Sequence, residues 1–256
     1  MKPLLCSALL LLTLPLAAQA PTAVPIPKEP HHHLVLENSY VRVFRVSVPA
    51  HEATLLHQHD VPYLYVALGP ADVVNAIQGK PEVRLVMTDG QLGYSPGHFA
   101  HIARTDSGLV FNNVTIELLH PQAEPRNLCE KVVEGPFKEC SSDSSKLPRD
   151  SPLIALAQAM RQKQLFETDE ILVTSFSIGF GQNYTEPGSQ RAGLLVVEDS
   201  SELRVDVPGQ SPQTLHGGEV LWLEAGKKWT IATPGEHRFT RFLLIRFNDG
   251  YASKKL

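Results

Sequence analysis

The stretch of sequence that decides the fold is HQHDVPYLYVALG, which spans residues 57–69. It begins with His57 and His59, two residues apart, and continues into the apolar run 64–68 before a glycine-proline turn. Residues two apart on a β-strand point to the same face of the sheet. The two imidazoles are therefore expected to converge on one point beside a buried strand.

Further short apolar runs lie on both sides of this stretch, at 41–48, 83–87 and 114–119. Val and Ile are frequent in them, and turn formers such as Gly79 and Gly90 separate them. Many short strands at regular spacing are typical of a β-sandwich or barrel. The region 34–120 is therefore predicted to be one all-β domain.

A second β-rich region, 166–250, repeats the first about 130 residues later. The corresponding apolar runs are 41–48 and 171–178, 64–68 and 194–197, and 114–119 and 242–247. A repeat of this length indicates a duplicated domain rather than a solenoid.

A third histidine, His101, follows the turn at Pro96 and opens another β segment. Three neutral imidazoles suit a divalent iron, manganese, zinc, copper or nickel ion. Three histidines that merely line a barrel mouth are the alternative, but burying them without partners is costly. The sequence therefore favours a metal site at His57, His59 and His101, with the identity of the metal open.

These residues resemble the two cupin motifs, G-x5-H-x-H-x3,4-E-x6-G and G-x5-P-x-G-x2-H-x3-N. The matching residues are His57, His59 and Gly69 for the first motif, and Gly90, Pro96 and His101 for the second. The resemblance covers most of both halves, although only the first half carries the motif residues. It implies an all-β fold of two tandem cupin-like barrels, each a jelly roll or double-stranded β-helix.

The chain departs from the cupin pattern at several positions. Tyr63 stands where the family has a glutamate ligand, and His98 and Thr105 stand where it has glycine and asparagine. The lost carboxylate leaves a three-histidine set, as in some iron-dependent cupin dioxygenases that act on thiols. Tyr63 could bind the metal weakly, donate a hydrogen bond to a bound oxygen species, or pack.

Two further residues are candidate accessory groups. His98 could contact a substrate or support a ligand, or be an ordinary turn histidine. Asp60 could orient an imidazole, or cap the turn before Pro62.

The second half has no imidazole at the equivalent positions. Residues 186–189 replace the histidine pair and Trp229 replaces His101. This barrel is therefore expected to bind no metal in this way, and to act as a structural partner or hold something apolar near Trp222 and Trp229. Those tryptophans are most simply core residues.

The N-terminal segment 1–20 has the layout of a secretory signal peptide. Lys2 precedes an apolar stretch at 4–16, and Ala18-Gln19-Ala20 fits a cleavage site. A secreted or periplasmic location is predicted, with an uncleaved anchor as the alternative. Residues 21–33 are rich in proline and histidine and are predicted to be an extended tether, in which the histidines 31–33 are incidental.

Residues 121–165 are predicted to link the two barrels. Cys129 and Cys140 form an even pair, which predicts a disulfide in an oxidising compartment. Ser151-Pro152 resembles a helix N-terminus, and apolar residues at helical spacing follow it. A short helix is expected there.

Charge and motifs exclude several classes of function. The net charge of −4 comes from mixed charges without a basic stripe, which argues against nucleic acid as a partner. No segment after the first twenty residues resembles a membrane span. The chain also lacks G-x-S-x-G, G-x-x-x-x-G-K and H-E-x-x-H sequences, so hydrolase and kinase functions are poor fits.

Two functions remain. The first is a metal-dependent enzyme acting on a small molecule, with dioxygenase-like chemistry implied by the cupin resemblance. The second is a non-catalytic module that binds a metal or small ligand. A homodimer is expected only by analogy with cupin folds that pair through their sheets.

Overall fold

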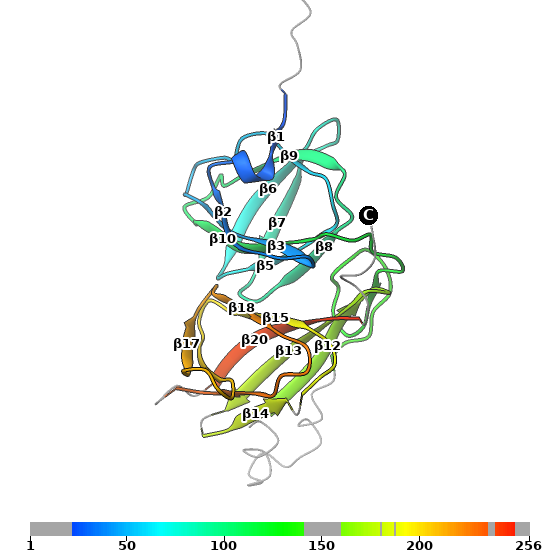
Figure 1. Cartoon of the computed structure of the whole chain (residues 1–256). Helices are drawn as coiled ribbons and strands as arrows, with labels where there is room; N and C mark the ends of the chain where they lie inside the picture. The colour runs from blue at the N-terminus through cyan, green and yellow to red at the C-terminus, as the bar shows by residue number, and fades with distance from the viewer. Residues whose placement is uncertain (1–21, 141–159, 180, 187, 235–238, 249–256) are drawn as a thin grey trace, which may run out of the picture.

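Two β-barrels, one from each half of the chain, are stacked in Figure 1. The computed structural model describes residues 22–140, 160–179, 181–186, 188–234 and 239–248. The predicted all-β fold of two tandem barrels is confirmed. Within the described ranges no helix has the length and apolar character needed to cross a bilayer.

The first barrel consists of two five-stranded sheets. One has the order β1 (Val24–Pro25), β4 (His57–His59), β9 (Phe99–Arg104), β6 (Ala71–Ile77) and β7 (Val83–Met87). The other has the order β2 (His32–Glu37), β3 (Val41–Val48), β10 (Phe111–Leu118), β5 (Tyr63–Ala67) and β8 (Leu92–Ser95).

The second barrel repeats this arrangement with one six-stranded and one four-stranded sheet. The larger has the order β11 (Arg126–Asn127), β12 (Met160–Glu167), β13 (Ile171–Gly179), β20 (Phe239–Phe247), β15 (Gly193–Val197) and β18 (Val220–Leu223). The smaller has the order β14 (Asn183–Glu186), β19 (Trp229–Ala232), β16 (Glu202–Asp206) and β17 (Gln213–His216). The order β14-β19-β16-β17 matches β4-β9-β6-β7, so corresponding residues can be identified from strand register.

The sheet β2-β3-β10-β5-β8 of the first barrel faces the six-stranded sheet of the second barrel, and the two share one hydrophobic core. On β3, Val41 and Val43 belong to this shared core, whereas Val46 and Val48 face the interior of the first barrel. The strand therefore gives apolar side chains to both faces, with the partly buried Arg42, Arg45 and Ser47 between them. Tyr40 packs against this core, with its ring 4.9 Å from that of Trp222.

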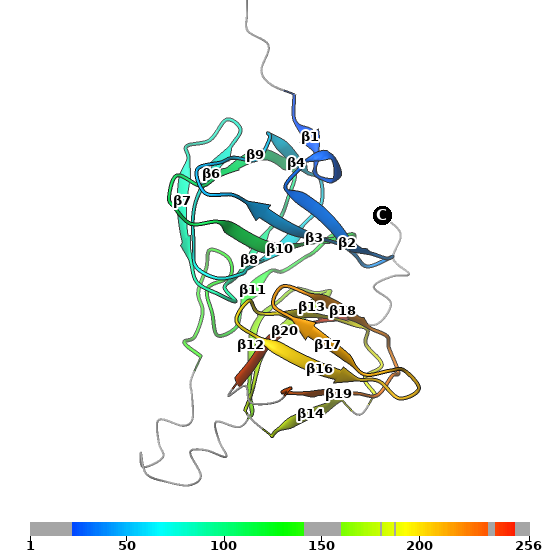
Figure 2. The same ribbon diagram turned by 90° about the vertical axis from the view of Figure 1, so that its left-hand side faces the viewer.

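The prediction of an N-terminal tether is wrong for residues 24–33. Strand β1 pairs in parallel with β4, and a 3-10 turn (Ile26–Lys28) leads from it toward β2. Ile26 is buried in the core of the first barrel. Figure 2 shows β1 beside β4 at the top of this barrel. Burial of Ile26 and the pairing of β1 with β4 attach this segment to the barrel, although its proline content suggested an unattached chain.

The linker prediction needs a similar correction. Residues 126–127 and 160–167 are strands β11 and β12, which join the larger sheet of the second barrel. The predicted helix start at 151–152 lies outside the described residues, as does the predicted signal peptide 1–20. From residue 160 onward the chain is strand and not helix.

The two cysteines of the linker lie side by side. Their Cα atoms are 4.5 Å apart, within the range that a disulfide requires. Both residues pack, partly buried, against the core shared by the two barrels. Their placement fits the predicted disulfide, which remains a proposal about the oxidation state.

Candidate metal centre

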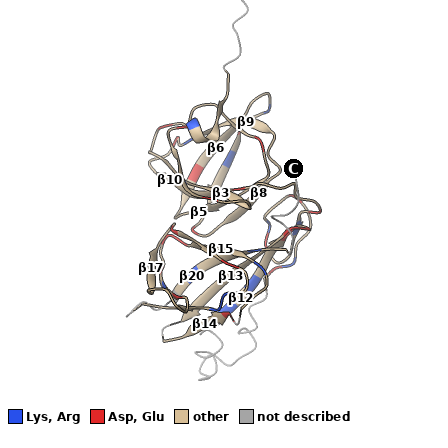
Figure 3. Cartoon of the chain, viewed as in Figure 1, with Lys and Arg blue, Asp and Glu red and all other residues tan. Residues whose placement is uncertain are grey.

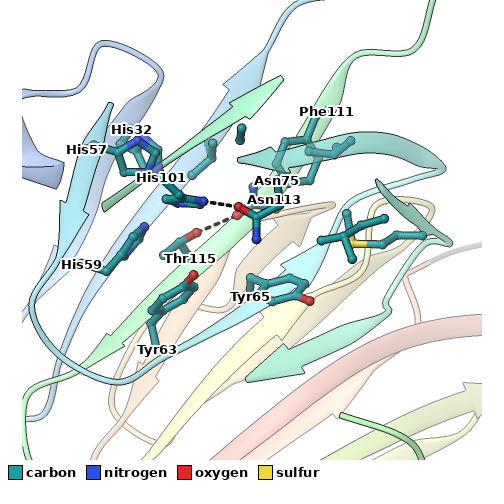
Figure 4. A pocket seen from close by; sticks show the side chains of 15 residues that line it. His32, His57, His59, Tyr63, Tyr65, Asn75, His101, Phe111, Asn113 and Thr115 are labelled. Atoms are coloured by element: carbon teal, nitrogen blue, oxygen red, sulfur yellow. Dashed lines mark hydrogen bonds between the residues drawn. The ribbon is translucent and has the colours of Figure 1, made fainter. Parts of the chain in front are cut away.

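The structure brings the three predicted histidines together inside the first barrel (Figure 4). His57 lies directly opposite His101 in the pairing of β4 with β9, and His59 points to the same face as His57. Ring centroids are 4.4 Å apart for His57 and His101, and 5.1 Å apart for each of the other two pairs. All three side chains are buried.

A fourth histidine that sequence analysis treated as incidental belongs to this cluster. His32, on β2, is buried, and its ring centroid lies 4.7 Å from that of His57. Candidate ligand atoms of His32, His57 and His59 all lie within 4.8 Å of one another. Two nitrogens bound about 2.1 Å from one tetrahedral zinc ion lie about 3.4 Å apart, so the widest of these separations would close by up to about 1.4 Å when an ion binds.

Hydrogen bonds fix the orientation of three of the imidazoles. The Nδ1–H of His57 donates to the Leu55 carbonyl at 2.9 Å, and that of His101 donates to Asn75 Oδ1 at 2.7 Å. His32 Nδ1 donates to Glu29 Oε2 at 2.6 Å. Each bond leaves Nε2 as the nitrogen with a free lone pair, which is how ligating histidines are commonly held.

The free nitrogens supply the test of whether a metal fits. Nε2 of His57 and Nε2 of His101 are buried without a hydrogen-bond partner, and so is Nδ1 of His59. Buried polar atoms without a partner are rare and costly. A divalent cation bound to these nitrogens would satisfy them, so the residues present fit a metal. The histidines whose ligand atoms all lie within 4.8 Å of one another are His32, His57 and His59, and His101 is not in that group.

His59 has different surroundings from the other three histidines. Its Nδ1 lies 3.9 Å from Glu117 Oε1, too far for a hydrogen bond. Glu117 forms an ion pair with Arg42 at 2.8 Å, although the two groups are not aligned as a hydrogen bond. The ring of Tyr63 stacks on His59 with centroids 4.1 Å apart. Of the three roles considered for Tyr63, packing is the one that this contact describes.

Burial keeps the imidazoles of His57, His59 and His101 uncharged. It lowers the pKa of His57 to about 4, with a further contribution from nearby His32. It likewise lowers the pKa of His101 to about 3, with His57 as the next cause, and that of His59 well below its ordinary value. These three imidazoles are therefore neutral at pH 7, which is the form that binds a metal.

Glu29 anchors the N-terminal segment to the cluster. Burial raises the pKa of its carboxyl, but hydrogen bonds from His32 and His31 outweigh this and bring the pKa to about 2. The carboxylate also accepts backbone N–H groups of His31 at 2.8 Å and Leu55 at 3.1 Å. Sequence analysis missed this residue, because nothing in the local pattern indicates that it is buried.

Two of the predicted accessory residues lie away from the cluster. Asp60 is exposed and does not line the pocket. His98 is also exposed, in a turn with a φ of 61°, and its backbone N–H donates to the His59 carbonyl at 2.6 Å. His98 therefore contributes its backbone conformation rather than its imidazole.

The cluster opens on a pocket between the two sheets of the first barrel, with about 520 Å³ of space not filled by atoms, open solvent at its mouth included. The other residues of its lining form an apolar and a polar group. The apolar group is Val46, Val73, Leu85, Met87, Ala103 and Phe111, and the polar group is Tyr63, Tyr65, Asn75, Asn113 and Thr115.

The second barrel has no histidine at the matching positions. In the pairing of β14 with β19, Glu186 lies opposite Trp229, where the first barrel has His57 opposite His101. Glu186 forms an ion pair with Arg246 and accepts a hydrogen bond from the Tyr184 hydroxyl at 3.0 Å. Trp229 is buried in the barrel core, whereas Trp222 lies beside Tyr40 between the barrels.

Comparison of the sequence with protein-family models finds no match, and comparison with curated proteins finds none either. Solved structures do match. AerE from Microcystis aeruginosa matches with a TM-score of 0.55 and 9% identity, over 86% of this chain and 99% of its own. A cupin 2 conserved barrel domain protein from Leptotrichia buccalis matches with a TM-score of 0.50 and 14% identity, over 85% and 88%.

An enzyme is also among the similar structures. Salicylate 1,2-dioxygenase from Pseudaminobacter salicylatoxidans matches with a TM-score of 0.55 and 11% identity, over 84% of this chain and 75% of its own. Identities this low establish the fold and leave the activity open. The strand topology and these likenesses together show that the chain is a two-barrel protein of the cupin fold.

Proposed function

We propose that this chain is an exported, metal-dependent enzyme that binds one divalent ion at the histidine cluster of the first barrel and acts on a small molecule in the adjoining pocket. The observation that carries the proposal is the set of buried imidazole nitrogens without partners at His57, His59 and His101. Their neutral form suits iron, manganese, zinc, copper or nickel.

The neighbouring pocket supports an enzyme rather than a closed structural site. It adjoins the histidines directly, so a molecule inside it can reach an ion held there. A bound ion would supply Lewis acidity and coordination positions for the substrate. Dioxygenase-like chemistry is part of the proposal because one structural neighbour is named as a salicylate 1,2-dioxygenase, and one of its structures is titled as an adduct with gentisate.

One observation favours a second candidate, a non-catalytic binding module. His32 brings a fourth imidazole to the cluster. Four protein ligands can close the coordination shell, as they do in structural zinc sites. In that case the ion would hold the N-terminal segment on the barrel and leave no position for chemistry.

Metal analysis and turnover separate these candidates. The chain is purified without a histidine tag, loaded with each of the five ions, and assayed for metal content and for oxygen uptake with small phenols and diketones. We expect one ion per chain, and loss of the ion in a His57→Ala/His101→Ala variant. The exposed His98→Ala serves as the control and should bind metal normally.

The possible outcomes distinguish an enzyme, a binding module and a protein without a metal site. A wild-type protein that binds none of the ions would end the metal proposal. Stoichiometric metal with a retained small molecule and no turnover would favour the binding module. Oxygen uptake that depends on both the metal and the pocket would favour the enzyme.

The proposal includes export and a disulfide. Segment 1–20 has the layout of a signal peptide, and Cys129 and Cys140 lie at disulfide spacing. Mass spectrometry of the exported protein should find a mature N-terminus near residue 21 and a mass two hydrogens below that of the reduced chain. An intact N-terminus or free thiols would contradict these parts. The expected homodimer remains untested, and the sheet of the first barrel that contains β3 already packs against the six-stranded sheet of the second barrel within one chain.

A further inference from the structure

Asn113 presents a hydrogen-bond donor to the pocket. This residue is buried on β10, and its Oδ1 accepts a hydrogen bond from the Thr115 hydroxyl at 2.7 Å (Figure 4). Its amide NH₂ has no partner among the described residues. Because the oxygen already accepts a hydrogen bond, the amide NH₂ is the group of Asn113 that is left to bind a ligand as a donor.

Asn75 and Tyr65 bring further donors to the lining. Asn75 Oδ1 is occupied by the Nδ1–H of His101, which leaves the amide NH₂ of Asn75 available. The Tyr65 hydroxyl has no hydrogen-bond partner in the described part of the chain. The ring of Tyr65 lies over Gly93, where a Cβ would overlap it, so the missing side chain at Gly93 leaves room for this orientation.

The lining carries no charged side chain. None of the 15 lining residues is Lys, Arg, Asp or Glu. The carboxylates nearest to the cluster, Glu29 and Glu117, lie behind the imidazoles, where they pair with His32 and Arg42. Figure 3 shows charged positions distributed along the strands of both barrels, with acidic and basic residues interleaved. An anionic group at the wall away from the histidines would thus be buried without a counter-ion, which is costly.

Apolar side chains line the pocket beside these donors. They include the branched side chains of Val73 and Leu85, the flexible Met87 and the ring of Phe111. Such a surface favours a ligand with a hydrocarbon or aromatic face.

We infer that the pocket takes a small molecule whose part facing away from the histidines is uncharged, with an oxygen that accepts a hydrogen bond from Asn113 and an apolar face against Leu85, Met87 and Phe111. This inference rests on the proposed function, which places the metal-binding end of the molecule at the histidine cluster. It adds the substrate class: neutral carbonyl compounds and not carboxylates.

Three catechols that differ only at the far end test this preference. They are 3,4-dihydroxybenzamide, 4-methylcatechol and 3,4-dihydroxybenzoate, and binding is measured by calorimetry on zinc-loaded protein, in which no redox turnover occurs. All three chelate through the same diol, so we attribute differences in affinity to the contacts between the group at the far end and the pocket lining. We expect the benzamide to bind more tightly than the benzoate by about tenfold or more, with the methyl compound between them.

Variants assign the preference to particular residues. Asn113→Leu removes the donor with little change in volume and should lower benzamide affinity to that of 4-methylcatechol. Asn112→Leu is the matched control, because Asn112 precedes Asn113 on β10 and does not line the pocket. Met87→Lys places a cation in the pocket and should reverse the order in favour of the benzoate.

A measurement without metal keeps this inference separate from the proposed function. Apoprotein is tested against benzamide and benzoate, which lack the diol, by ligand-observed NMR. Preference for benzamide in a protein that binds no zinc would refute the metal proposal and uphold the neutral pocket. Zinc binding together with equal or tighter binding of the carboxylates would overturn the neutral pocket and leave the metal proposal standing.

Discussion

The two barrels share the order of their central strands, but the side chains that fill them differ: the first barrel has polar residues at positions where the second has apolar ones. Strand pairing aligns Asn113 with Phe242. Asn113 lies opposite Val46 of β3, and Phe242 lies opposite Phe176, the corresponding residue of β13. Phe176 and Phe242 stack face to face at 5.0 Å in the second barrel, whereas Asn113 lines a pocket in the first.

Other matched positions differ in the same direction. Tyr65 and Thr115 lie opposite each other in the first barrel, where the second has Leu195 and Leu244. Asn75, which orients His101, corresponds to Val205. Because the second barrel forms with apolar residues at these positions, the fold does not require the polar groups of the first at them. Buried polar atoms kept at a cost to stability indicate a function.

The largest expected effect is on stability, at the aligned residues Phe242 and Asn113. Phe242→Ala removes a fully buried ring and should lower the free energy of unfolding by about 3–5 kcal/mol. Asn113→Ala should cost only about 1 kcal/mol, the value of its bond with Thr115. Urea denaturation of metal-free protein measures both, and equal losses would contradict the contrast between a packed and a functional interior.

The stability of the metal-free protein should depend on pH through the buried His57 of the first barrel. His57 has a folded-state pKa of about 4, below the unfolded value of about 6.5, so the unfolded state binds more protons between these values. The metal-free protein should therefore lose stability as pH falls from about 6.5 to 4, by on the order of 3 kcal/mol for this residue. His57→Ala should flatten that slope, and an unchanged slope would show that the buried imidazole is not responsible.

His32 and its neighbour His33 test the fourth imidazole. His32 is buried in the cluster, while His33 is exposed on the other face of the same strand. We expect His32→Ala to weaken zinc binding by about 10–100-fold in competition with a chromophoric chelator, and His33→Ala to leave it unchanged. Equal effects from the two variants would remove His32 from the site.

The smallest expected effect concerns the turn before β9. His98 has a left-handed φ of 61°, whereas the turn before β19 has Gly226 with a φ of 75°. Because glycine adopts this conformation without steric cost, His98→Gly should stabilise the first barrel by up to about 1 kcal/mol. Its melting temperature should rise slightly while zinc affinity stays the same, and a loss of affinity would give the imidazole a role in the site.

The comparison also explains what could be predicted from the sequence. The duplicated barrels follow from apolar runs that recur at a fixed offset, and His57, His59 and His101 follow from strand alternation together with motif spacing. His32 could not be predicted, because it reaches the cluster through long-range pairing with Val46. The burial of Glu29 and Ile26 could not be predicted for a related reason. It depends on contacts with β4 and the residues just before it, and the prolines around Glu29 and Ile26 suggested a tether.

The central claim is tested most directly by a crystal of the metal-loaded protein measured at the absorption edge of the bound ion. The account predicts one anomalous peak, bonded to imidazole nitrogens of His57, His59 and His101 in the first barrel, with His32 beside it, and no peak near Glu186 and Trp229 in the second. A peak held outside the histidine cluster, or an ordered cluster without any peak in saturating metal, would contradict it.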